Sequence, residues 1–200
     1  HDFAVLQHGR KVAQVQWALG GVHNQLNALA AIAAAHHVGV APQDAAQAMA
    51  RFESVLRRME RRGMVRGITV YDDFAHHPTA MSTTLDGLRR QVGSSARILA
   101  VFEPRSNTMK LGTMKAQLPW ALESADLAFC HTAGLDWDAA AALAPLGTGP
   151  GGRAQTAPNV EHLVAQVVQA AQAGDHIVCM SNGAFGGVHE RLLQALGKAH

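Results

Sequence analysis

Two asparagines, Asn24 and Asn27, stand three residues apart near the start of an expected helix, in the sequence HNQLN. At this spacing both side chains lie on one face of a helix. A carboxamide presents a donor beside an acceptor, which matches the N6 and N7 edge of adenine, and the free N–H groups of a helix start favour a nearby anion. A helix cap is the alternative role for Asn24. Capping accounts for one asparagine and not for the second, so the pair indicates a binding function.

A second polar cluster occupies residues 71–78, YDDFAHHP, after a short apolar run. In open parallel sheets ligands bind at the carboxyl ends of the strands, where this cluster would lie. We therefore expect Asp73, His76 and His77 to contact a nucleotide or a substrate. The alternatives are surface positions for Asp72 and His77 with Asp73 as a cap, or a metal site of one Asp and two His. Adjacent histidines on an extended segment point to opposite sides, so we predict no metal here.

Arginines stand in two further segments. Residues 57–62, RRMERR, form a basic run, which is usually a solvated face, although one arginine could meet a phosphate or carboxylate in a bidentate contact. Residues 103–108, EPRSNT, follow another apolar run, and Arg105 is suited to grip a carboxylate. A helix cap formed by Ser106 or Asn107 is an equally good account of this second segment.

Residues 181–187, SNGAFGG, form a glycine-rich turn between an apolar run and the last expected helix. Such a turn admits a ligand close to the backbone, or an anion. It lacks the GxGxxG spacing of dinucleotide folds, and the GxxxxGK[ST] loop that grips a triphosphate occurs nowhere in the sequence. Cys130 and Cys179 lie in apolar runs, so we expect both in the core of a protein from a reducing compartment.

The elements that must position these residues alternate from residue 68 onward. Four short apolar runs are expected to be strands, at 68–71, 97–102, 126–130 and 176–181. Helical patterns follow them at 79–91, 110–124, 159–173 and 188–196. Alternation of strand and helix is typical of right-handed βαβ units and a mostly parallel sheet. We expect residues 139–157 to be a flexible surface loop.

The residues before this alternation have a different pattern. Short strands at 3–6 and 12–19 are expected to precede helices at 22–37 and 43–51. The sequence opens without a methionine in the middle of an expected strand, which favours a piece of a longer protein. We therefore predict the end of a neighbouring domain at 1–38, a helix and interdomain joint at 39–63, and an α/β, Rossmann-like domain at 64–200.

The composition limits the class of protein further. Hydrophobic residues make up 48% of the 200 residues and charged residues 16%, which excludes a disordered chain. The net charge of +2 gives no reason to expect a nucleic acid partner. No apolar run approaches the roughly 18 residues of a membrane span, and we expect no cleavable signal, because no apolar segment follows a basic start in the first residues. We expect a cytoplasmic protein with no membrane partner, and its twelve scattered histidines lack metal-ligand spacing.

Taken in order, these segments resemble the Mur ligase family. The matching stretches are GVHNQLNALAAIAAAHHVGV, RFESVLRRMERRG, ITVYDDFAHHPTA, ARILAVFEPRSNTMKLG and MSNGAFGGVHERLLQAL. The resemblance implies the end of a central ATP-binding domain followed by a C-terminal Rossmann-like domain, whose mostly parallel sheet is flanked by helices. The P-loop, a carbamylated lysine and most magnesium ligands of such enzymes would lie upstream, so we expect these 200 residues alone to be inactive.

The reaction implied by the resemblance is ATP-driven amide-bond formation with Mg²⁺. ATP would convert the lactyl carboxylate of UDP-N-acetylmuramate to an acyl phosphate, which the amine of the recycled tripeptide L-Ala-γ-D-Glu-meso-diaminopimelate attacks. The protein would contribute positioning and charge neutralisation. The strings EPRSNTMKLG and SNGxFGG favour the tripeptide; the alternatives are L-alanine as acceptor or a non-catalytic nucleotide-binding module. No oligomeric state follows from the sequence.

The resemblance also implies tasks for individual residues. Nucleotide contacts would come from Asn24, Asn27, Arg58 and Asp73, with the asparagines on adenine, Arg58 on the phosphates, and Asp73 on the ribose or orienting that arginine. The cleft near the acceptor would be lined by His76 and His77. The incoming peptide would be bound by Arg105, Ser106, Asn107, Asn182, Gly183 and Gly186, with Arg105 on a peptide carboxylate and the loop 183–187 closing over the peptide.

Overall fold

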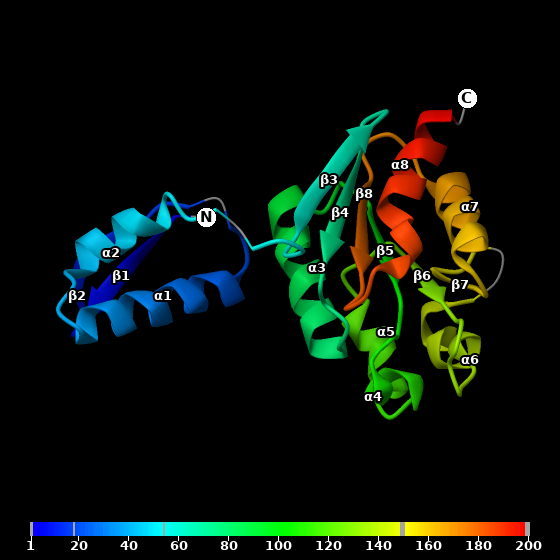
Figure 1. The fold of residues 1–200 in the computed structure, drawn as a ribbon, viewed down its shortest axis with the longest axis horizontal. Coiled ribbons are helices and arrows are strands. Elements are labelled where there is room, and N and C mark those ends of the chain that lie inside the picture. Colours follow the sequence, from blue (N-terminus) through cyan, green and yellow to red (C-terminus); the bar gives the residue numbers. More distant parts are fainter. Residues whose placement is uncertain (1, 18, 54, 149–150, 199–200) are drawn as a thin grey trace. The chain divides into compact units, whose positions relative to one another are not determined.

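The computed structural model describes residues 2–17, 19–53, 55–148 and 151–198, and the chain divides into two compact units, His1–Val55 and Leu56–His200 (Figure 1). Each unit has a hydrophobic core of its own. Within the described residues no helix is both long and apolar enough to cross a lipid bilayer.

The first unit is a β-hairpin followed by two helices. Strands β1 (Phe3–Gln7) and β2 (Arg10–Val15) pair antiparallel around His8 and Gly9, which both have positive φ angles, as a two-residue hairpin turn requires. Helices α1 (Val22–His37) and α2 (Pro42–Met49) follow. Both expected helices are confirmed, whereas the strand expected at 12–19 begins earlier, at Arg10, and ends at Val15, the last residue paired with β1.

The second unit is built on a six-stranded sheet of order β3-β4-β8-β5-β6-β7. Its strands are β3 (Glu60–Val65), β4 (Ile68–Asp73), β5 (Ile98–Phe102), β6 (Leu127–His131), β7 (Ala154–Ala157) and β8 (His176–Met180). Only the β3–β4 pair is antiparallel. The predicted α/β, Rossmann-like architecture with a mostly parallel sheet is confirmed.

Helices cover both faces of this sheet (Figure 1). One face packs against α3 (Pro78–Val92), α5 (Leu118–Ala121) and α6 (Ala139–Leu143), and the other packs against α7 (Val160–Ala170) and α8 (Val188–Lys198). Strand β5 is buried along its whole length because alternate residues serve each face: Ile98 and Phe102 point to the first, and Leu99 and Val101 to the second.

Three segments differ from the sequence expectation. The region 139–157, expected to be a flexible loop, contains α6, a 3₁₀ turn (Ala144–Leu146) and strand β7. Residues 60–65, for which no strand was expected, form β3. The helix expected at 110–124 is divided into α4 (Asn107–Lys110), a 3₁₀ turn (Lys115–Gln117) and α5, because Gly112 has a φ of 72° and Pro119 lacks a backbone N–H.

Candidate functional site

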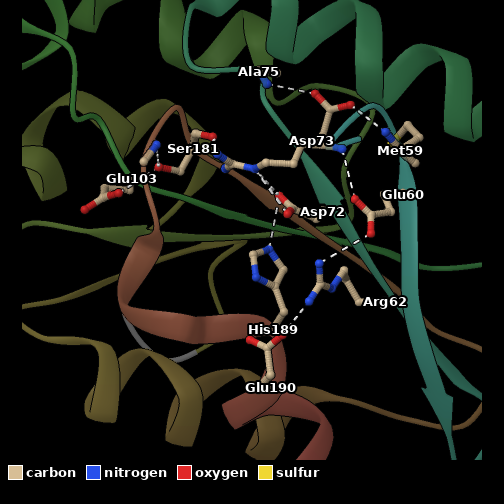
Figure 2. Close-up of polar contacts among 12 residues, drawn as sticks. Met59, Glu60, Arg62, Asp72, Asp73, Ala75, Glu103, Ser181, His189 and Glu190 are labelled. Carbon is tan, nitrogen blue, oxygen red and sulfur yellow. Dashed lines mark hydrogen bonds and ion pairs between the residues drawn. The ribbon is translucent and has the colours of Figure 1, made fainter. Parts of the chain in front are cut away.

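Polar side chains follow four neighbouring strands at the carboxyl edge of the sheet. The order β4-β8-β5-β6 places next to one another the strand ends that carry Asp73, Ser181, Glu103 and His131. Asp73, Ser181 and His131 are buried, with 3%, 1% and 9% of their surface exposed. Figure 2 shows how closely the polar groups near β4 and β8 interlock. Because buried polar groups need partners, from the protein or from a ligand, this edge is the candidate site.

The carboxylate of Asp73 ties three segments together. Figure 2 shows its contacts with Met59 and Ala75. Its Oδ1 accepts hydrogen bonds from the Ala75 N–H at 2.8 Å and the Thr84 hydroxyl at 3.2 Å, and its Oδ2 accepts one from the Met59 N–H at 2.9 Å. Asp73 is not the cap of α3, because that position belongs to His77. Both carboxylate oxygens therefore fix the chain around the end of β4.

Asp72 is buried and paired rather than exposed on the surface (Figure 2). Arg57 Nε lies 3.3 and 3.2 Å from its two oxygens, and Arg57 Nη2 donates to the Ser181 carbonyl at 2.6 Å. His189 Nε2 lies 3.2 Å from Asp72 Oδ1, an ion-pair distance without the direction of a hydrogen bond. Burial lowers the pKa of His189 and outweighs the opposing charges of Asp72 and Glu190, so the imidazole is neutral at neutral pH.

The basic run contains two arginines with different surroundings. Arg57 is half-buried and held by Asp72, whereas Arg58 is exposed. Both guanidinium carbons lie over the ring of Phe74, at 5.2 Å for Arg57 and 5.5 Å for Arg58 from its centroid. Of the arginines in this run, Arg57 meets a carboxylate of the same chain, but through Nε alone, which is shared between the two oxygens of Asp72, so the contact is not bidentate. Arg58 forms no hydrogen bond or ion pair with the described residues.

The two predicted histidines, His76 and His77, lie after β4, from which Phe74 and Ala75 separate them, and both are half-buried. His76 Nδ1 lies 3.0 Å from the Phe74 carbonyl, and its ring meets the Phe74 ring edge-on at 5.5 Å. His77 occupies the N-cap position of α3 without a side-chain hydrogen bond to the helix. In the described part of the chain no three His, Cys, Asp or Glu side chains are grouped as metal ligands would be.

A third polar cluster joins the ends of β5, β6 and β8. The Ser181 hydroxyl donates to Glu103 Oε2 at 2.7 Å and accepts from the Gly183 N–H at 2.9 Å (Figure 2). His131 Nδ1 lies 3.7 Å from Glu103 Oε1. Burial opposes the ionisation of Glu103, but His131 and Ser181 outweigh it and hold the pKa of Glu103 below its ordinary value. Sequence reasoning missed His131, for which the only signal was its position at the end of an expected strand.

The residues predicted to bind a peptide lie in the loops after β5 and β8. Arg105 is exposed and packs against Gly183, where a β-carbon would stand 2.6 Å from Cδ of the arginine. Ser106 caps α4, since its hydroxyl accepts from the Met109 N–H at 3.3 Å, so the capping alternative holds for this serine. The other members of this set are exposed Asn107, Asn182 with a buried Oδ1 that lacks a partner among the described residues, and Gly186 with a φ of 56°.

The predicted asparagine pair belongs to the first unit. Asn24 is half-buried, and its Nδ2 donates to the Gly20 carbonyl at 2.7 Å. The N-cap of α1 is Gly21, so the alternative in which Asn24 caps this helix is wrong. Asn27 lies one turn further along α1 and is exposed. The Asn24 side-chain oxygen and its second N–H proton form no hydrogen bond with the described residues.

The site chemistry suits the binding of anions and polar chains. Arg58 and Arg105 are exposed cations at the carboxyl edge of the sheet, and both have planar donor groups that match phosphate or carboxylate oxygens. The lack of a side chain at Gly183 lets the Arg105 side chain pack directly against the backbone there. The carboxylates of Asp72 and Asp73, in contrast, are already engaged by the protein.

Comparison with known proteins identifies a family and several relatives that this chain resembles. The family described as Mur ligase, glutamate ligase domain, matches residues 57–183. The UDP-N-acetylmuramate–L-alanyl-γ-D-glutamyl-meso-2,6-diaminoheptandioate ligase of Escherichia coli K12 is 51% identical over 198 residues, which cover 98% of this chain and 42% of that protein. The UDP-N-acetylmuramate–L-alanine ligase of Rhodospirillum centenum is 32% identical over 203 residues, with coverage of 98% and 42%.

A solved structure of a ligase also resembles this chain. The crystal structure of a murein peptide ligase from Psychrobacter arcticus 273-4 superposes with a TM-score of 0.73 at 41% identity, over 100% of this chain and 42% of that one. The chain thus spans less than half the length of the curated relatives that it matches.

Proposed function

The chain belongs to the Mur ligase family, and from this premise we propose that it is part of an ATP-dependent ligase that joins UDP-N-acetylmuramate to the tripeptide L-Ala-γ-D-Glu-meso-diaminopimelate. The observation that carries the proposal is the contrast in identity over the same share of the chain. It is 51% with a ligase named for the tripeptide and 32% with one named for L-alanine. The reaction would serve the recycling of peptidoglycan, in the cytoplasm, where buried free thiols such as Cys130 and Cys179 stay reduced.

The chemical task is to make a carboxylate reactive toward an amine. A carboxylate is a poor electrophile, so ATP with Mg²⁺ would supply the phosphoryl group that turns its oxygen into a leaving group. The chain's own contribution is to position the reactants and to neutralise their negative charge. We assign Arg58 to the polyphosphate, because its guanidinium is exposed and unpaired among the described residues.

Asp73 fits the positioning role better than the ribose role. Both of its oxygens already accept hydrogen bonds from the protein, and one of these comes from the N–H of Met59, the residue that follows Arg58. We therefore propose that Asp73 orients the segment bearing Arg58. Asn24 and Asn27 are assigned to adenine, for which the free oxygen and N–H of Asn24 are suited.

The acceptor peptide is assigned to the loops after β5 and β8. Arg105 would bind a peptide carboxylate in a bidentate contact, with its side chain packed against Gly183, and Gly183 and Gly186 would contribute their backbone to the peptide site. The remaining contacts are assigned to Ser106, Asn107 and Asn182. Since the Ser106 hydroxyl is engaged as the cap of α4, Ser106 would contribute its backbone. His76 and His77 would line the cleft near the acceptor.

Phosphate release by the full-length protein containing this sequence tests the proposal. The assay supplies ATP, Mg²⁺ and UDP-N-acetylmuramate with one of three acceptors: L-alanine, the diaminopimelate tripeptide, or the same tripeptide with lysine as its third residue. Release with the diaminopimelate tripeptide alone supports the assignment. Release with L-alanine alone would replace it with the biosynthetic reaction. Release with none of them would overturn the assignment and leave the family membership intact.

A further inference from the structure

Phe74 contacts two of the predicted site residues, Arg58 and His76, and neither the sequence nor the proposed reaction gives it a task. It follows β4 directly and is half-buried. Among the described residues it belongs to none of the hydrophobic clusters that form the cores. Its ring instead contacts the polar side chains of Arg57, Arg58 and His76. An aromatic ring used in this way holds cations by the negative charge of its face.

Both the backbone and the side chain of Arg57 are held by hydrogen bonds. Its backbone carbonyl accepts from the Phe74 N–H at 2.8 Å, and its own N–H donates to Glu60 Oε2 at 3.0 Å. Its guanidinium donates hydrogen bonds to the Asp72 carboxylate and the Ser181 carbonyl. Its φ of 58° is a strained value for a residue with a side chain, and these contacts hold it there. Arg57 is therefore an anchor that binds the segment before β3 to the ends of β4 and β8.

Arg58 is held only by its surroundings. The residues on both sides, Arg57 and Met59, have left-handed backbones that are fixed by hydrogen bonds, with the Met59 N–H on Asp73. The Arg58 backbone is thus constrained from both directions, while its guanidinium rests on the Phe74 ring with its donors unused by the described residues. Since Asp72 balances the charge of Arg57, Arg58 supplies the net positive charge beside the ring.

We propose that Phe74 is a positioning residue that holds the Arg58 guanidinium in place for a polyphosphate ligand, while Arg57 anchors the same loop and takes no part in ligand binding. The ligand chemistry in this statement rests on the proposed function. The division of labour between the two arginines rests on the contacts alone. Substituting the ring should therefore weaken the polyphosphate contact through Arg58, because Arg57 stays held by Asp72 and Ser181 without the ring.

Nuclear magnetic resonance of the 200-residue chain tests the contact itself. The ring current of Phe74 should shift the side-chain proton resonances of Arg58 away from those of an exposed arginine. Phe74→Tyr, which keeps the ring, should preserve that shift, and Phe74→Leu should abolish it. Trp120→Leu, which removes a half-exposed ring on α5, serves as the control and should leave it unchanged. Wild-type Arg58 resonances at the positions of an exposed arginine would overturn the proposal.

Steady-state kinetics of the full-length protein test the consequence. We expect Phe74→Leu to raise KM for ATP about tenfold, the loss of a partly desolvated cation–π contact, and to leave KM for UDP-N-acetylmuramate unchanged. Phe74→Tyr should restore the wild-type value. In the double variant Phe74→Leu with Arg58→Ala, KM for ATP should match that of Arg58→Ala alone, because the ring acts through the arginine. Additive effects would overturn the proposal.

The two experiments distinguish a failure of the proposed function from a failure of the positioning role of Phe74. If the full-length protein consumes no ATP with any acceptor, the proposed function fails, and the resonance shifts still decide whether Phe74 holds Arg58. If ATP is consumed and Phe74→Leu leaves KM for ATP at the wild-type value, the proposed function stands and the positioning role is wrong. Thermal unfolding of each variant, compared with wild type, identifies any that fail to fold.

Discussion

Arg105 packs against Gly183 so closely that a β-carbon on the glycine would stand 2.6 Å from both Cδ and Cζ of the arginine. The two residues come from the loops after β5 and β8, which are neighbours in the sheet. Gly183 does not have a positive φ, so glycine is needed here for space and not for backbone conformation.

Gly183→Ala should therefore change binding more than stability. Arg105 is exposed and its side chain is long, so it can move aside, and we expect the unfolding free energy to change by less than about 1 kcal/mol. In the full-length protein the displaced guanidinium should raise KM for the tripeptide about tenfold, the usual scale of one charge-assisted hydrogen bond. Arg105→Gln is the matched variant, and combining the two should add nothing. An unchanged KM in Gly183→Ala would contradict the assignment of Arg105.

Asp73→Asn should destabilise the second unit by about 2–4 kcal/mol. The Asp73 carboxylate accepts three hydrogen bonds, and the NH2 group of an asparagine would face at least one of these donors without being able to accept from it. Urea unfolding of the 200-residue chain measures the change. Asp136→Asn, at an exposed position, is the control and should have little effect. Equal stabilities of the two variants would show that the Asp73 contacts do not hold the strand end.

His189 should give the chain a pH dependence of defined sign. Burial lowers its folded-state pKa, while the unfolded chain titrates near the ordinary value of about 6.5. Between these values the unfolded state binds the extra proton, so the unfolding free energy falls as pH decreases below about 6.5 and stops changing below the folded-state pKa. The groups that face His189 are Asp72, Glu190, Arg62 and Arg57.

Unfolding free energies measured between pH 7.5 and 5 test this prediction. His189→Gln should reduce the slope relative to wild type, and His37→Gln, exposed on α1, should leave it unchanged. Equal slopes for wild type and His189→Gln would mean that the imidazole titrates alike in both states.

Ser181→Ala should raise the pKa of Glu103. The serine hydroxyl donates to Oε2 of this carboxylate and so favours its ionised form, against burial, which favours the neutral form. Carbon-13 resonances of the glutamate carboxyl group, followed through a pH titration, report the shift. Thr132→Ala removes a hydroxyl near the same edge that donates to the Ala157 carbonyl, and it should leave the Glu103 titration in place.

The sequence predicts the central strands and long helices because their apolar periodicity is strong. It does not predict β3, whose residues Arg61 and Arg62 are exposed and whose partner is set by the turn at Gly67. It misses β7 as well, since AQTA has no apolar run. These edge strands are stabilised by pairing with a neighbour and not by an intrinsic preference.

The candidate site likewise has a part that the sequence predicts and a part that it does not. Strand ends can be located from sequence, so the edge that carries Asp73, Arg105 and Ser181 is where we expected polar groups. Which of two adjacent arginines meets Asp72 cannot be predicted from their order, because the left-handed backbone at Arg57 decides it. That conformation depends on hydrogen bonds from residues far along the chain.

The edge strand β3 also influences how copies of this chain behave toward one another. An exposed strand edge is a template on which another chain can add a strand, the first step of aggregation. Here the register shifts between Arg61 and Gly63, which interrupts a regular ladder, and two arginines add like charges along the edge. The exposed arginines that hide β3 from sequence analysis, together with this shift in register, therefore protect the sheet against growth from this side during folding and at high concentration.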